Sequence, residues 1–221
     1  MKKVLLAFIF LMPAVFLAQV TIPFSSDRGM VVFTREKEPE NYTGSPYMEE
    51  DFQRGIIHDE QGRTMGALMR YNAIEDVVLI KLQEQDEESY VLPKKTNITY
   101  ELPGYTYFID NIQTDNGNKE SFFARYYKGE KSDFIGVPKL DIIPAQKAKT
   151  GYDKDRPTDI DVEMVYYIAL DNNFYRETRL KEKDLKKFFT SSAMEEYFKS
   201  HKIKDVKDVI EMLKYYESTA S

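Results

Sequence analysis

The chain has 221 residues, of which 42% are hydrophobic and 31% are charged, a composition typical of a folded protein with a solvent-exposed surface. Its formal net charge of −6 disfavours binding to nucleic acid, which depends on cationic neutralisation of phosphates. Cysteine is absent, which excludes disulfides, thiol catalysis and thiolate metal sites. There are only two histidines, so the commonest general base and metal ligand is scarce as well.

Residues 1–18 have the layout of a secretory signal peptide. Lys2 and Lys3 form a positive start, a short apolar run follows, and Pro13 precedes a stretch that ends at Ala18. The apolar run is shorter than the ~20 residues that a membrane-spanning helix needs, although an uncleaved N-terminal anchor is the alternative. We therefore expect cleavage near Ala18 and no transmembrane segment in the mature chain. The mature protein is expected to be periplasmic, outer-membrane associated or extracellular.

Residues 19–178 are predicted to form an antiparallel β domain, because apolar side chains recur there with a period of two. The clearest runs are Met65–Tyr71, Asn97–Leu102 and Met164–Leu170. Turn sequences such as Pro103-Gly104 separate the strands. The expected fold class is mainly β (α+β): an antiparallel β-sandwich, roll or barrel followed by a short C-terminal helical segment.

The stretch from Pro138 to Asp161 has no clear period and contains two further prolines, so we expect a long loop. Four aspartates lie between Asp153 and Asp161, a composition that can supply oxygen ligands to calcium. The spacing of an EF-hand loop is not met, because both the glycine of the sharp turn and the closing glutamate are missing. We therefore expect a solvated acidic loop and no metal site.

Residues 179–221 are predicted to form a helical segment that packs on the β domain. Its clearest apolar stripe has helical spacing and consists of Val206, Val209, Ile210 and Leu213. Asp205 is placed to cap this helix, and Ser192 with Glu195 forms a capping-box pattern for the helix before it. Residues 179–217 hold ten basic and eight acidic side chains. Docking of a partner by this weakly cationic segment is the alternative to packing on the sheet.

Arg70, Tyr71 and Asn72 are the candidate binding residues. Arg70 lies on a predicted strand between Met69 and Tyr71, and it is expected to point to the opposite face from both. An arginine in such a position can hold a carboxylate or phosphate of a ligand through two parallel hydrogen bonds. The alternative is an internal ion pair with a nearby acid such as Glu75 or Asp76.

No catalytic residue and no cofactor is predicted. His58 and His201 are far apart in sequence, and the Gly-x-Ser-x-Gly pattern of serine hydrolases does not occur. The chain has 16 tyrosines and 14 phenylalanines, which could stack on sugars, but it lacks tryptophan. Most of these aromatic residues fall on alternating strand positions, where packing in the core explains them.

Four short features are shared with a known group of exported proteins. They are Phe16–Gln19, the Gly44–Tyr47 turn ahead of Phe52, the Met69–Asn72 strand and the closing Leu213–Tyr216. Together they resemble uncharacterised exported proteins of Bacteroidetes-type bacteria. The resemblance implies export, and it implies no activity or functional residue.

These observations favour an exported, non-catalytic binding or structural protein of the bacterial cell envelope. Its partner would be an envelope protein or polymer rather than nucleic acid. The alternative is a carboxylate-based hydrolase that acts on an envelope or extracellular polymer. That function needs a pocket in which two carboxylates lie about 5–9.5 Å apart, with the pKa of one of them raised.

Overall fold

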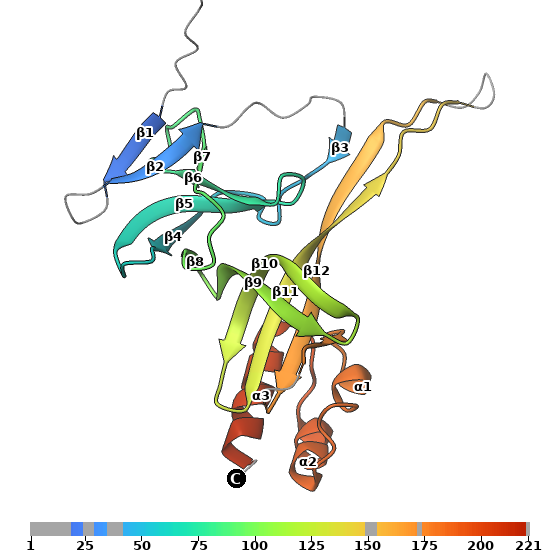
Figure 1. Cartoon of the computed structure of the whole chain (residues 1–221). Coiled ribbons are helices and arrows are strands. Elements are labelled where there is room, and N and C mark those ends of the chain that lie inside the picture. Colours follow the sequence, from blue (N-terminus) through green and yellow to red (C-terminus); the bar gives the residue numbers. More distant parts are fainter. Residues whose placement is uncertain (1–18, 24–28, 35–41, 149–153, 172–173, 220–221) are drawn as a thin grey trace, which may run out of the picture.

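A computed structural model describes residues 19–23, 29–34, 42–148, 154–171 and 174–219. The predicted signal peptide, residues 1–18, lies outside these ranges. The chain is mostly β, with 49% in strands, and its helices follow the sheet at the C-terminal end (Figure 1). The expected mainly β fold class is confirmed.

The described strands form one large sheet. Their bounds are β1 (Gln19–Pro23), β2 (Gly29–Thr34), β3 (Tyr42–Gly44), β4 (Gln53–His58), β5 (Thr64–Asn72), β6 (Val77–Lys81), β7 (Tyr90–Val91), β8 (Thr99–Leu102), β9 (Tyr105–Thr114), β10 (Gly117–Lys128), β11 (Ser132–Ile143), β12 (Thr158–Leu170) and β13 (Arg176–Thr178). The order across the sheet is β1-β2-β7-β6-β5-β4-β8-β9-β10-β11-β12-β13. All of these neighbours are antiparallel, whereas β3 lies parallel to β12. The sheet does not close on itself.

Three helices follow β13: α1 (Glu182–Leu185), α2 (Ser192–Ser200) and α3 (Val206–Thr219). Asp205 accepts a hydrogen bond from the Asp208 amide at 3.1 Å, as expected of a residue that caps α3. The expected capping box of α2 does not form. Ser191 caps that helix instead, so Met194 occupies the position where the motif needs a glutamate.

The helices pack on one face of β10, β11 and β12 (Figure 1). Within the stripe proposed for α3, Val209 and Leu213 are completely buried, whereas Val206 and Ile210 are half-buried. Their cluster includes Phe134 of β11 and apolar side chains of β12. A second cluster joins the faces of β4–β6 and β8–β10, and a third lies on the other face of β9–β12.

Both ends of the segment expected to be a loop are strands of a β-hairpin arm, so that expectation is wrong for residues 138–143 and 158–161. β11 continues to Ile143 and pairs with β12 up to Asp159, and a further bridge joins Gln146 to Arg156. In the arm, apolar residues alternate with charged ones, and prolines lie near both ends of the segment. This composition is typical of a loop, but backbone hydrogen bonds between β11 and β12 stabilise extended strands there.

Candidate binding sites

The predicted site residue Arg70 is held between two aromatic rings. Its guanidinium carbon lies 3.4 Å from the centre of the Tyr47 ring and 4.4 Å from that of Phe52. The alternative interpretation of Arg70, an ion pair with Glu75 or Asp76, is wrong, because no such pair forms and Lys94 pairs with Asp76 at 2.7 Å instead. Contact with two aromatic faces stabilises a cation without any acidic partner.

Tyr71 and Asn72 are buried, with 2% and 0% of their surfaces exposed. The Tyr71 hydroxyl donates to Asp76 at 2.5 Å, and the Asn72 side-chain oxygen accepts from the Ile74 amide at 2.9 Å. These bonds hold the turn between β5 and β6. Arg70, Tyr71 and Asn72 therefore lie on one strand, but Tyr71 and Asn72 are buried while Arg70 is half-buried between two aromatic rings.

A buried carboxylate that sequence reasoning missed lies close to this strand. Glu49, in the segment between β3 and β4, is 8% exposed and accepts three hydrogen bonds. The donors are the Tyr71 amide at 2.6 Å, the Tyr107 hydroxyl at 2.8 Å and the Tyr105 hydroxyl. Burial and the negative charge of Glu49 raise the pKa of Tyr105 and Tyr107, so both phenols keep their protons and remain donors.

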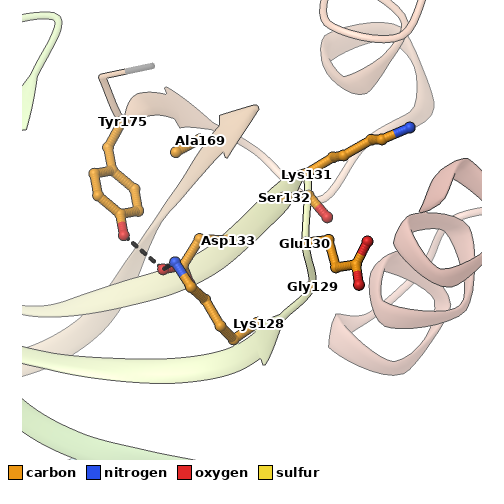
Figure 2. Close-up of a pocket in the computed structure, with 8 residues that line it drawn as sticks. All are labelled: Lys128, Gly129, Glu130, Lys131, Ser132, Asp133, Ala169 and Tyr175. Atoms are coloured by element: carbon orange, nitrogen blue, oxygen red, sulfur yellow. Dashed lines mark hydrogen bonds and ion pairs between the residues drawn. The ribbon is translucent and has the colours of Figure 1, made fainter. Parts of the chain in front are cut away.

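The second buried carboxylate is Asp133, 3% exposed, in a cavity of about 160 Å³ between the start of β11 and Tyr175 (Figure 2). Lys128 Nζ donates to Asp133 at 2.9 Å, the Tyr175 hydroxyl at 2.7 Å and Arg125 Nε at 3.2 Å. Burial and the Asp133 charge raise the pKa of Tyr175. These donors neutralise and hold the carboxylate, a structural arrangement that lets a charge lie inside the protein.

The cavity at Asp133 also has Glu130 in its wall, but the two carboxylates do not face each other. Figure 2 shows the Glu130 side chain directed away from Asp133. The cavity is also smaller than the ~300–1,000 Å³ of common ligand pockets. Asp133 and Glu130 are therefore not directed into this cavity as a facing pair of carboxylates (Figure 2).

A larger cleft of about 470 Å³ lies where β13 leads into α1. Its wall includes four cationic side chains, Arg176, Arg179, Lys183 and Lys187. It also includes three acidic ones, Asp115, Glu177 and Asp184. Cations therefore exceed acids in this cleft, although the protein as a whole is acidic.

The cations of the cleft differ in their contacts. Lys187 donates to Asp184 at 2.7 Å, which lowers the pKa of that carboxyl group, and the Arg176 guanidinium lies 4.4 Å from the centre of the Phe188 ring. Arg179 and Lys183 are exposed and make no ion pair with any residue that the structure describes. Sequence periodicity did not find this cleft, because its cations come from a strand, a connection and a helix.

The two histidines lie in separate parts of the fold. His58 on β4 contacts Glu101 at 2.9 Å, and His201 stacks on Tyr197 with 4.2 Å between ring centres. In the described ranges, no group of three or more His, Asp or Glu side chains is arranged to hold a metal ion. None of the helices there is long and apolar enough to cross a membrane.

Comparison of the chain with known proteins adds no further constraint. No family model, curated protein or solved structure matches it. The resemblance to exported proteins of Bacteroidetes-type bacteria therefore stays a prediction from the sequence.

Proposed function

We propose that the protein is an exported, non-catalytic binding or structural protein of the bacterial cell envelope. In this proposal the cleft between β13 and α1 binds an anionic group of an envelope protein or polymer. The observation that carries it is the surplus of cations there, with Arg179 and Lys183 exposed and without ion-pair partners among the described residues. The signal-peptide pattern of residues 1–18 supports export.

The chemistry of the cleft favours a carboxylate or phosphate group. An arginine side chain presents a planar fork of donors to such groups, and a lysine adds a mobile point charge. The volume of about 470 Å³ lies in the range of sites that hold a small molecule, and it would also accept one unit of a polymer. Phe188 provides an apolar surface beside the charges.

The alternative, a carboxylate-based hydrolase, receives less support. Its acid and base would have to be free to exchange protons with a substrate. Glu49 and Asp133 are instead buried and each is held by three hydrogen-bond donors. Carboxylates held in this way stabilise the fold, and the Asp133 cavity is small for a polymer chain.

The proposal can be tested by capture of partners from cross-linked cell envelopes with the mature chain, residues 19–221. The variant Arg179→Glu/Lys183→Glu reverses two charges in the cleft, and Lys202→Glu/Lys204→Glu is the matched control outside it, because both of its side chains are exposed and in no ion pair among the described residues. We expect the cleft variant to capture about ten-fold less partner while the control captures as much as the wild type. Both melting temperatures should stay near that of the wild type, because all four side chains are exposed.

Two results would count against this assignment. Equal capture by the wild type and the cleft variant would show that the cleft is not the binding site. Release of soluble fragments from purified envelope polymer by the mature protein would show that it is an enzyme.

A further inference from the structure

The arm formed by β11 and β12 extends beyond the neighbouring strand β10. The last pair between β10 and β11 joins Ala124 to Gly136, whereas β11 and β12 stay paired up to Ile143 and Asp159. Figure 1 shows this hairpin reaching away from β9 and β10. No described strand pairs with the outer edge of β11 over residues 138–143. Such an edge is a template for another strand.

The register identifies which backbone groups point outward from this edge. The Ile160 carbonyl accepts a hydrogen bond from the Ser45 amide at 3.1 Å, so the backbone polar groups of Ile160 face β3. Ile142 lies opposite Ile160, and in an antiparallel ladder its backbone groups must then point away from β12. The backbone groups of Leu140 and Pro138, two and four residues earlier, also point away from β12, because backbone N–H and C=O groups of successive residues point to opposite edges of a strand. The outward N–H groups are therefore those of Leu140 and Ile142, since proline has none.

The residues on this edge are complementary to themselves. If two β11 edges meet antiparallel with Leu140 opposite Leu140, then Lys139 of each copy lies opposite Asp141 of the other. Opposite charges in directly facing positions stabilise a strand pair. Each Leu140 can donate its N–H to the other Leu140 carbonyl, and each Ile142 can donate to the Pro138 carbonyl that faces it.

The side chains favour pairing at the edge over stacking of the arms. One face of the arm carries Asp141, Asp159, Asp161 and Glu163, with Lys139 as the basic residue among them. Two such acidic faces would repel each other. Ile142 is 55% exposed, and edge pairing would place it beside Pro138 of the second copy.

We propose that two copies of this chain associate through the outer edges of β11, paired antiparallel around Leu140 to make one continuous sheet. The association is separate from the anionic-group cleft, which lies beside α1, and it does not rest on the proposed function.

The proposal is tested by sedimentation velocity of the mature chain over a range of micromolar concentrations. The wild type is expected to shift from monomer to dimer as its concentration rises. Lys139→Asp and Asp141→Lys each place like charges opposite one another at two symmetric positions, and each should raise the dimer Kd about ten-fold. The double variant Lys139→Asp/Asp141→Lys restores both opposite-charge pairs and should restore the dimer.

Two further variants separate edge pairing from other effects. Asp161→Lys makes the same charge change on the same face, directly across from Asp141 but on the inner strand, and it should leave the Kd within about two-fold. Leu140→Pro removes an N–H that points away from β12, so the chain should fold and stay monomeric. A wild type that is monomeric throughout, a double variant without rescue, or equal weakening by Asp161→Lys would each overturn the proposal. Circular dichroism confirms folding of every variant.

Discussion

Buried tyrosines should set an alkaline limit to the stability of this fold. Tyr71, Tyr100 and Tyr107 are 2%, 2% and 0% exposed, and burial raises the pKa of each phenol well above its ordinary value of 10.0. Nearby carboxylates raise the pKa of Tyr71 and Tyr107 further. Below pH 10 the folded and unfolded chains both keep these protons, so the three phenols add no pH dependence to the free energy of unfolding there.

Above pH 10 the unfolded chain releases the three protons while the folded chain retains them, so the free energy of unfolding falls as pH rises. Each phenol lowers it by about 1.4 kcal/mol per pH unit until the folded pKa is reached. The three together remove about 4 kcal/mol by pH 11 and about 8 kcal/mol by pH 12. Total stabilities of about 5–15 kcal/mol are usual, so we expect cooperative unfolding between about pH 11 and pH 12.

The assay is an alkaline titration followed by circular dichroism and by the near-ultraviolet absorbance of tyrosinate. Loss of β structure should coincide with a steep rise in absorbance as the buried phenols ionise together. Tyr100→Phe is a suitable companion variant, because burial alone raises the pKa of Tyr100, and its unfolding should depend less steeply on pH. If instead all tyrosines ionise gradually near pH 10 with the fold intact, the argument from burial is wrong.

Three further predictions concern other parts of the chain. Glu49→Ala leaves two buried donors and one half-buried donor without their acceptor, so urea unfolding should show a loss of about 3 kcal/mol or more, and a loss under ~1 kcal/mol would contradict the structural role. Leu213→Ala in the fully buried part of α3 should cost about 3–5 kcal/mol, and the half-buried Ile210→Ala clearly less; a freely moving tail would leave both melting temperatures unchanged. Intact-mass analysis of the protein from envelopes should give a chain that starts near Gln19, whereas a mass that retains residues 1–18 would refute cleavage.

The periodicity of apolar residues predicted most of the fold class. The alternation between Met164 and Leu170 correctly predicted a strand, although both faces of β12 are covered there, by the helices on one side and by β9 and β10 on the other. Helical spacing between Val206 and Leu213 reflects which side of α3 is buried, and that information is local. The cap at Asp205 was predictable for the same reason, since its partner is three residues away. The arm was missed because its prolines and charges concealed an alternation that only the partner strand makes evident.

The candidate sites depended on contacts between distant parts of the chain. Glu49 looks like one residue of a solvated acidic run, but its donors Tyr71, Tyr105 and Tyr107 are 22, 56 and 58 residues away. Arg70 was recognised as unusual, yet only the fold showed that the rings of Tyr47 and Phe52 enclose it. A local pattern determines which face of a strand is apolar. Which charged groups become buried is decided when the folded sheet brings their donors together, because an unpaired charge is too costly to leave inside.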